Sequence, residues 1–381
     1  MKKTIQDINE KIKQKKVKVV TAEEMTQIVR SVGPAKAAEK VDVVTTGTFG
    51  AMCSSGIWIN FGHSDPPIKI AKCWLNDVQG YGGVAAVDTY LGAAQFSDSQ
   101  GEIYGGAHVI EDLVKGKHVI LRAEARATDC YPRKFIETEL TIADLNQVTM
   151  CNPRNAYQKY AVATNSGSRT LYTYLGKLLP HFGNAAYSGA GELSPIINDR
   201  FFRTIGIGTR IFLGGAKGYI IGSGTQHSPE TEFGTLMVQG DLKKMDPKFL
   251  KAASFKRYGP SLCVGIGVPI PVLDTQMAQS TGISDEEILT TVLDYNVPSR
   301  KRPVLRPVSY AELKSGVVDI KGIKVKTHCL SDLSRARKIA KQLKKWIEEG
   351  SFFLTEPVER LPRQGTCQPM RERRVRILEK K

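Results

Sequence analysis

Apolar residues recur at helical spacing near both ends of the chain. Near the N-terminus, Ile5, Ile8 and Ile12 follow three- and four-residue steps and so share one face of a helix. Near the C-terminus, residues 331–349 place apolar side chains on one face and lysines and arginines on the other, and Gly350 follows as a helix stop. Both segments therefore predict amphipathic helices.

A further helix is predicted to begin at Thr21. Thr21 and Glu24 have the spacing of a capping box, and Gly33 is expected to close the helix. Residues 17–20 lead the chain into this helix, and the apolar run at 41–46 predicts a strand after it. The segment 47–67 follows with four glycines and two prolines, a composition that excludes regular helix.

The middle of the chain alternates short apolar runs with more polar segments. Runs bounded by glycine predict strands at 82–91, 117–121, 160–164, 210–213, 218–221 and 262–268. Helices are predicted at 142–148, 168–179, 246–252 and 284–294. This mixture indicates an α/β or α+β fold, a mixed sheet with flanking helices and glycine-rich loops that ends in the basic amphipathic helix.

Residues 299–306 form a basic connector that contains Pro303 and is flanked by Pro298 and Pro307. This connector is the expected boundary within the chain. We therefore expect three parts: a catalytic core at 1–298, a basic segment at 299–362 packed on it, and a flexible basic tail at 363–381.

The composition, 41% hydrophobic and 24% charged residues, is that of a folded protein. No apolar run approaches the roughly 18 residues of a membrane helix, and no apolar signal segment follows the opening Met-Lys-Lys, so we expect a cytoplasmic protein without membrane contact. The formal net charge is +16, and +13 of it lies from Val297 onward. That segment is either a solvated face or a surface for an acidic partner; it has few aromatic residues to stack on bases, so nucleic acid is not expected.

Seven cysteines and six histidines are the candidates for nucleophiles and metal ligands. No cysteine pair has the Cys-x-x-Cys spacing of a zinc or iron–sulfur site, and no histidines are paired at helical spacing. We therefore expect reduced thiols, no bound metal and no cofactor held by this chain.

Cys130 has the most strongly basic surroundings of the seven. Three cations lie within four residues of it: Arg126, Arg133 and Lys134. Nearby positive charge favours the thiolate, which is the nucleophilic form, although Asp129 opposes this effect unless it is paired elsewhere. Cys130 is therefore the first candidate nucleophile.

Cys53 lies in a glycine- and serine-rich segment whose backbone N–H groups could converge on an anion or a bound sulfur. His63, ten residues later, and His227, in a second glycine-rich loop, are candidate proton carriers. Arg154 offers a planar guanidinium group suited to a substrate carboxylate.

These residues belong to motifs that resemble, in order, those of a known family. The motifs are CSSG (53–56), FGHSDPPIK (61–69), WLND (74–77), ATDCYPRK (127–134), NPRNAY (152–157), IGIGTRIFLGG (205–215) and VGIGVPIP (264–271). They resemble the homocysteine biosynthesis family, the L-aspartate semialdehyde sulfurtransferases of archaea and anaerobic bacteria, over roughly residues 15–360.

The resemblance implies sulfur insertion into L-aspartate semialdehyde to give L-homocysteine, with Cys130 matching the family's persulfide-bearing cysteine and Cys53 its second cysteine. On this hypothesis the persulfide of Cys130 attacks the aldehyde and Cys53 resolves the sulfur–sulfur bond. The substrate carboxylate binds Arg154 and one of the cations beside Cys130, and His63 or His227 carries protons.

The chemistry also requires a reductant, because a thioaldehyde is two electrons short of a thiol. The implied donor is a separate iron–sulfur protein, a ferredoxin-like partner, with sulfide or another sulfur donor as co-substrate. Ferredoxins are usually acidic, which gives the basic C-terminal helix a docking role. Two other readings stay open: a cysteine-dependent hydrolase, which needs no reductant, and a basic nucleic-acid- or protein-binding module with structural cysteines.

Overall fold

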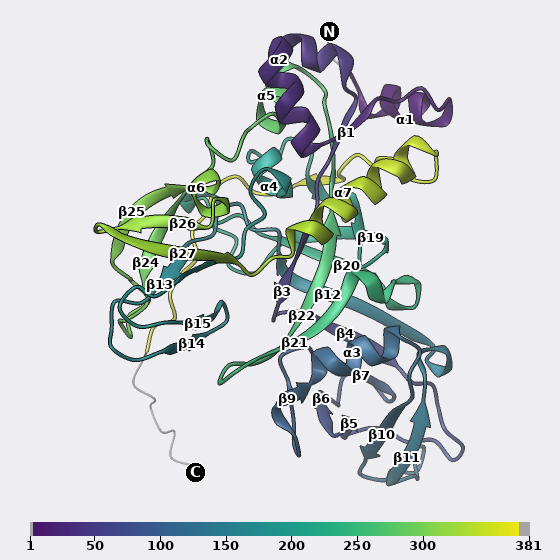
Figure 1. The fold of residues 1–381 in the computed structure, drawn as a ribbon. Coiled ribbons are helices and arrows are strands. Elements are labelled where there is room, and N and C mark those ends of the chain that lie inside the picture. The colour runs from purple at the N-terminus through teal and green to yellow at the C-terminus, as the bar shows by residue number, and fades with distance from the viewer. Residues whose placement is uncertain (1–2, 373–381) are drawn as a thin grey trace.

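A computed structural model describes residues 3–372, which fold into three larger sheets with several of the helices gathered at the upper end (Figure 1). The nine-stranded central sheet has the order β21-β22-β18-β19-β20-β12-β4-β7, and β3 pairs with β22. Its strands are β3 (Thr48–Met52), β4 (Gly56–Asn60), β7 (Asp88–Gly92), β12 (Gln147–Asn155), β18 (Arg210–Leu213), β19 (Ala216–Ser223), β20 (Leu236–Asp241), β21 (Leu250–Phe255) and β22 (Gly259–Gly267).

A six-stranded sheet at the left of Figure 1, here called the β24 sheet, has the order β25-β24-β13-β16-β27-β26. Its strands are β13 (Val162–Thr164), β16 (Ala185–Tyr187), β24 (Leu289–Asp294), β25 (Val304–Ser309), β26 (Val317–Ile320) and β27 (Ile323–Cys329). The β13–β24 and β16–β27 pairs are parallel, whereas β24 and β25 are antiparallel, so the sheet is mixed.

A second six-stranded sheet, the β10 sheet, lies at the lower right of Figure 1 in the order β11-β10-β5-β6-β8-β9. Its strands are β5 (Lys72–Leu75), β6 (Val78–Gly80), β8 (Phe96–Ser97), β9 (Gly101–Gly105), β10 (Val119–Glu124) and β11 (Phe135–Leu140). Three small sheets complete the strands: β1 (Val19–Thr21), β2 (Val43–Thr45) and β23 (Pro269–Pro271); β14 (Leu171–Thr173) and β15 (Gly176–Leu178); β17 (Gly206–Ile207) and β28 (Glu359–Arg360).

The helices are α1 (Ile5–Lys13), α2 (Ala22–Lys40), α3 (Gly106–Val114), α4 (Pro195–Asn198), α5 (Thr275–Thr281), α6 (Tyr310–Lys314) and α7 (Leu333–Glu348). This content confirms the mixed α and β class. None of the helices in residues 3–372 is long and apolar enough to cross a membrane.

The predicted N-terminal helices are confirmed, with one difference in length. Thr21 caps α2, and its hydroxyl and the Glu24 carboxylate form the reciprocal capping-box hydrogen bonds. Gly33 has a positive φ of 78°, but the chain resumes the helix after Pro34. Gly33 therefore makes a kink instead of the predicted end.

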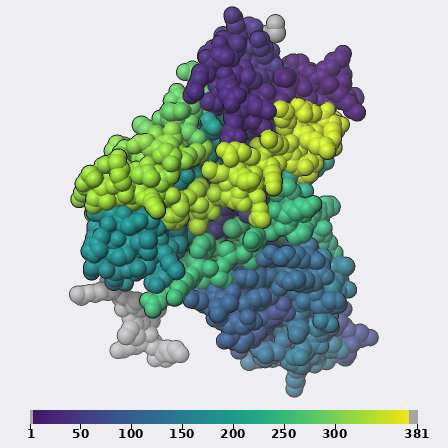
Figure 2. Space-filling view, viewed as in Figure 1, coloured from purple at the N-terminus to yellow at the C-terminus, as the bar shows by residue number. Residues whose placement is uncertain are grey.

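Helix α7 confirms the predicted basic amphipathic helix and packs on the N-terminal part of the molecule. Its buried face includes Ile339, Leu343 and Ile347, which join Ile8 and Ile12 of α1 in one apolar cluster. Figure 2 shows α7, in yellow, between the purple N-terminal residues and the green strands.

Four predicted helices are wrong, because most of their residues form strands that pair with other strands. Residues 168–179 form the β14–β15 hairpin, which turns at Gly176 with a φ of 87°. The hydrogen bonds between Ser284 and Glu287 exist, but they close a turn before β24, a strand rich in β-branched residues. In 142–148 and 246–252, a single turn of 3₁₀ helix leads directly into β12 or β21.

The expected boundary at 298/299 falls in the connection between β24 and β25, which are neighbours in one sheet. The residues after it therefore contribute three strands to the β24 sheet as well as α7. In the tail, residues 363–372 contain no helix or strand, and residues 373–381 lie outside the described residues.

Candidate active site

A cavity of about 430 Å³ lies between the central sheet and the β24 sheet. Strands β3, β12 and β22 supply one wall, and the connection between β24 and β25 with the β14–β15 hairpin supplies the other. The lining residues that carry chemistry are Cys53, Arg154, Tyr157, Tyr160, Tyr174, Tyr258, Ser261, Arg300 and Arg302.

Cys53 occupies the tight turn between β3 and β4. The turn is closed by the Ser55 N–H, which donates to the Met52 carbonyl over 3.0 Å. The Tyr258 hydroxyl donates to the Cys53 Sγ over 3.6 Å. Burial raises the pKa of Tyr258 above its ordinary value, so at neutral pH the phenol is protonated and keeps its proton for this hydrogen bond.

Three guanidinium groups line the same cavity. Arg154 comes from β12, and Arg300 and Arg302 come from the connection between β24 and β25. No aspartate or glutamate lines the cavity, and within residues 3–372 no carboxylate lies within 4.0 Å of these three groups. The cavity therefore has the charge of an anion-binding site.

Tyrosines form much of the remaining wall. The rings of Tyr157 and Tyr160 meet edge to face at 4.6 Å, and the hydroxyls of Tyr174 and Tyr295 are 2.8 Å apart. Burial raises the pKa of Tyr157, Tyr160 and Tyr295. These phenols are therefore neutral and do not cancel the positive charge of the arginines.

Cys130 lies elsewhere, on the exposed loop between β10 and β11. Its Sγ is 3.6 Å from the Thr128 hydroxyl. The neighbouring Tyr131 ring stacks on His63 with 5.9 Å between the ring centres. The Arg133 guanidinium donates to the Asp65 carbonyl over 2.7 Å, which ties this loop to the segment that follows β4.

The two candidate cysteines are associated with opposite ends of β4. Cys53 precedes the strand, which begins at Gly56, whereas His63, beside the Cys130 loop, follows its end at Asn60. Four steps along a strand span about 13 Å. A disulfide needs Cα atoms within about 7 Å, so the arrangement in this structure does not supply the direct resolving step expected from the sequence.

The sequence-predicted residues thus divide into two groups. Cys53 and Arg154 share the cavity. Arg126, Arg133 and Lys134 stay with Cys130 and His63 on or beside the exposed loop, and none of these five lines the cavity. Arg154 lines the cavity with Arg300 and Arg302 and not with the cations next to Cys130.

His227 lies near the cavity without lining it; its neighbour Gln226 does so. The His227 Nε2 donates to the Pro362 carbonyl over 3.0 Å, and Nδ1 accepts from the Thr235 N–H over 3.0 Å. The Nε2 hydrogen bond attaches the C-terminal segment to the core, and the Nδ1 hydrogen bond holds the His227 loop to Thr235.

Four other thiols are disfavoured as nucleophiles by burial, which raises their pKa. The pKa values of Cys263 and Cys329 rise to about 11, and those of Cys73 and Cys151 also rise. These side chains are protonated at neutral pH and behave as small apolar groups.

Sequence reasoning missed Tyr258, Ser261, Arg300 and Arg302. Arg300 and Arg302 lie in the stretch that it interpreted as a basic connector. The signal that could have found them is the pair of arginines next to Tyr295, a combination that often stacks, in a proline-bounded segment directly after a strand.

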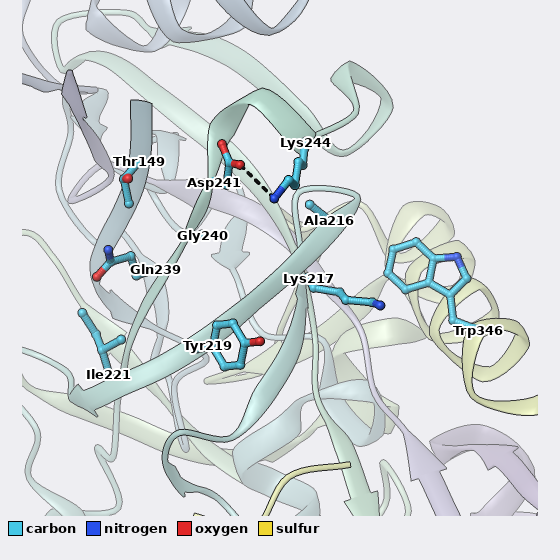
Figure 3. Close-up of a pocket in the computed structure, with 10 residues that line it drawn as sticks. All are labelled: Thr149, Ala216, Lys217, Tyr219, Ile221, Gln239, Gly240, Asp241, Lys244 and Trp346. Carbon is cyan, nitrogen blue, oxygen red and sulfur yellow. Dashed lines mark ion pairs between the residues drawn. The ribbon is translucent and has the colours of Figure 1, made fainter. Parts of the chain in front are cut away.

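A larger cavity, of about 890 Å³, lies between α7 and the β19–β20 part of the central sheet (Figure 3). Lys217 and Tyr219 project from β19, Lys217 points toward Trp346 of α7, and Lys244 pairs with Asp241 over 3.2 Å. It is lined by neither cysteine nor histidine, so it lacks a nucleophile for sulfur chemistry. Across residues 3–372 no cluster of three or more metal-ligating side chains is found.

Comparison with known proteins gives a family match and close relatives. A family model described as "Homocysteine biosynthesis enzyme, sulfur-incorporation" matches residues 17–354. The chain is 57% identical to an L-aspartate semialdehyde sulfurtransferase of Methanosarcina acetivorans, over 98% of this chain and 74% of that protein. It is 56% identical to a protein of the same name from Methanocaldococcus jannaschii, over 95% of this chain and 74% of that protein. No solved structure matches.

Proposed function

Because the chain belongs to the homocysteine biosynthesis family of sulfur-incorporating enzymes, we propose that it converts L-aspartate 4-semialdehyde to L-homocysteine. The family and the two close relatives make the chain an enzyme of sulfur transfer in homocysteine biosynthesis. The identity of the substrate, the route of the sulfur and the source of electrons are the parts that we propose.

The overall reaction fixes what the protein must provide. An aldehyde and hydrogen sulfide, with two electrons and two protons, give a primary thiol and water. If the sulfur arrives instead as the outer atom of a persulfide, four electrons are needed, and two of them cleave the sulfur–sulfur bond. The reductant that we propose is a separate ferredoxin-like iron–sulfur protein.

The observation that carries the proposal is the cavity in which a thiol faces guanidinium groups and no carboxylate. Cys53 lines it together with Arg154, Arg300 and Arg302. A guanidinium group binds a carboxylate in a defined orientation, which would hold the amino-acid end of the substrate while its aldehyde carbon approaches the sulfur.

We further propose that the two cysteines divide the sulfur-transfer work between them. Cys130 is exposed, so an external donor can load it as a persulfide. The outer sulfur then passes to the Cys53 thiol, leaving Cys130 as a thiol, an exchange that consumes no electrons. The exchange requires the loop at 125–134, of the same chain or of a second copy, to approach the cavity.

In the cavity, the outer sulfur of Cys53 attacks the aldehyde carbon and the carbonyl oxygen takes up a proton. Two-electron cleavage returns the Cys53 thiol and releases a thiohemiacetal. Loss of water and a second two-electron reduction give homocysteine. Relative to the expectation from the sequence, Cys53 takes the role of attack and Cys130 that of loading, because Cys53 is the one that lines the cavity with the arginines.

The test is mass spectrometry after anaerobic incubation with a sulfur donor, together with an assay of homocysteine formed with a low-potential chemical reductant. We expect one added sulfur atom at Cys130 and at Cys53 in the unaltered protein. Cys53→Ala should keep the sulfur at Cys130 and lose at least about 100-fold of its homocysteine formation, because the attacking sulfur is gone.

Cys367 supplies the matched control, since it is exposed like Cys130 but does not line the cavity. Cys367→Ala should leave both readouts unchanged. Undiminished homocysteine formation by Cys53→Ala would refute the assignment of the reaction to this cavity.

A further inference from the structure

Arg302 is held at the cavity wall by an aromatic ring. Its guanidinium carbon lies 3.9 Å from the centre of the Tyr295 ring, and within residues 3–372 no carboxylate pairs with it. Its Nε is buried and has no hydrogen-bond partner among the described residues. Buried polar groups are nearly always hydrogen bonded, so this N–H group, at the wall of a cavity, is available to a ligand atom.

Ser261 gives a second, independent observation of the same kind. It is 1% exposed, its hydroxyl lacks a hydrogen-bond partner among the described residues, and it lines the same cavity. The residue after it, Leu262, pairs with Met52 in the β22–β3 register, so Ser261 lies beside Cys53.

Contacts between tyrosines connect the two unpaired groups along one wall. Tyr258 contacts the Cys53 sulfur, and its ring centre is 6.2 Å from that of Tyr174. The Tyr174 hydroxyl is 2.8 Å from that of Tyr295, on which Arg302 stacks. The cavity therefore has a sulfur end, at Cys53 and Ser261 with Arg154 close by, and a second guanidinium group, that of Arg302, at the other end of this row of tyrosines.

We infer that Arg302 is the receptor for the α-carboxylate of the substrate, with the exposed Arg300 at the rim beside it. An amino-acid aldehyde bound this way directs its far end toward Cys53, where the Ser261 hydroxyl donates to the carbonyl oxygen. The site then selects short aldehydes that carry a carboxylate over those that lack one. This inference rests on the proposed function and names the group that gives it substrate specificity.

The experiment compares two aldehydes, L-aspartate 4-semialdehyde and its decarboxylated analogue 3-aminopropanal, with unaltered protein and with Arg302→Met. We expect the unaltered protein to prefer the carboxylated aldehyde by about 100-fold in kcat/KM, and the variant to lose most of this preference through a higher KM. The preference is a ratio within one protein sample, so partial misfolding of the variant cancels. Arg302→Lys should restore part of it.

Arg257 offers a matched control. Its guanidinium group also lies over a tyrosine ring, that of Tyr172 at 5.1 Å, but it does not line the cavity. Arg257→Met should leave the preference intact. An equal loss by Arg302→Met on both aldehydes would show that Arg302 only supports the fold, and would overturn the inference.

A binding measurement separates this inference from the proposed function. L-Homoserine carries the same carboxylate but no aldehyde, so it binds without reacting. If the unaltered protein binds homoserine and Arg302→Met binds it at least 10-fold more weakly, the result supports carboxylate binding by Arg302, even if no homocysteine is formed. Equal binding by the two proteins contradicts the site whatever the activity.

Discussion

The Cys53 sulfur has one side-chain hydrogen-bond donor among the described residues, the Tyr258 phenol. The phenol is kept protonated by burial, so it can stabilise negative charge that develops on the sulfur without competing for the proton. A hydrogen bond to a charged group contributes more than one between neutral groups. At the scale of single residues, the reactivity of Cys53 should therefore depend on Tyr258.

Replacing Tyr258 with phenylalanine keeps the ring beside Tyr174 and removes only the hydroxyl. We expect the rate of Cys53 alkylation at a fixed pH near 8 to fall about 5- to 10-fold, because the thiolate loses its donor. The measurement is the rate of iodoacetamide labelling of Cys53, followed by peptide mass spectrometry.

Tyr219 provides the comparison, since it lies on β19 and lines the larger cavity. Tyr219→Phe should leave the labelling rate of Cys53 unchanged. A Tyr258→Phe variant that labels as fast as the unaltered protein would mean that the phenol does not influence the sulfur.

Individual residues could be predicted from the sequence where their chemistry is visible in their type and neighbours. This holds for Cys53 and Arg154, which the cavity brings together. It fails for Arg302 and Tyr258, because their relevance depends on where distant strands place them. A cluster of cations around Cys130 is visible in the sequence, whereas its exposure on a loop of another sheet is not.

At the scale of elements, local signals predicted helices correctly when the signal was complete. Helices α1, α2 and α7 combine an apolar period with a capping residue, and the α1 and α2 caps are complete capping boxes. The segment at 284–294 has the capping pair but is β-branched beyond it, and pairing with β13 and β25 decides its conformation. Such long-range pairing cannot be read from one segment alone.

Asp274, at the start of α5, makes a pH-dependent contribution to stability. Its carboxylate receives two hydrogen bonds from Arg203, of 3.0 and 2.5 Å, and one from the Met277 N–H. The hydrogen bond from Arg203 is the main cause that lowers the pKa of Asp274 to about 2, from 3.8. Because the folded-state pKa is lowered, the stabilisation is present above about pH 4 and is lost as the pH falls through about 2.

Asp274→Asn keeps an oxygen to cap the helix and removes the charge. We expect a loss of about 1–2 kcal/mol in the free energy of unfolding at pH 7, discounted for the partial exposure of the pair, and a difference that shrinks as the pH falls below about 4. Thermal or urea unfolding from pH 7 to 2.5 measures it. Asp246→Asn serves as the control and should show little effect at any pH, because Asp246 is a half-buried capping residue whose ion-pair partner, Lys248, is 4.0 Å away. A difference that does not depend on pH would contradict the role of the charge.

At the scale of the whole molecule, the positive charge of the C-terminal part is partly neutralised by ion pairs within the protein. On α7, Arg337 pairs with Glu23 and Lys344 with Glu24, both over 2.8 Å. Lys338 and Lys341 are exposed, and no carboxylate among residues 3–372 lies within 4.0 Å of them. A docking role for α7 toward an acidic ferredoxin-like protein therefore rests on these two lysines.

Reversing both charges, in Lys338→Glu with Lys341→Glu, should weaken binding of a ferredoxin-like protein at least 10-fold at low salt and should flatten the salt dependence. Isothermal calorimetry at two ionic strengths measures both effects. Lys301→Glu, a single charge reversal outside α7, should have a smaller effect. Unchanged affinity in the double variant would show that α7 is only a solvated face.

The segregation of charge and the mixed fold class could be predicted from the sequence, because both are sums over many residues. The layering of three larger sheets could not. It depends on pairs such as β3 with β22 and β13 with β24, whose partners are far apart in the chain. The candidate site lies where two of these sheets meet. The residues of its second wall, in the connection between β24 and β25 and in the β14–β15 hairpin, could therefore not be predicted from the sequence.

The cavity joins parts of the molecule with separate apolar interiors. Met52 belongs to the large interior packed around the central sheet, whereas Val292, on the strand that leads toward Arg302, belongs to a second one under the β24 sheet. A substrate bound between Cys53 and Arg302 would contact both of these parts at once. We therefore expect substrate binding to restrict relative motion of these two parts.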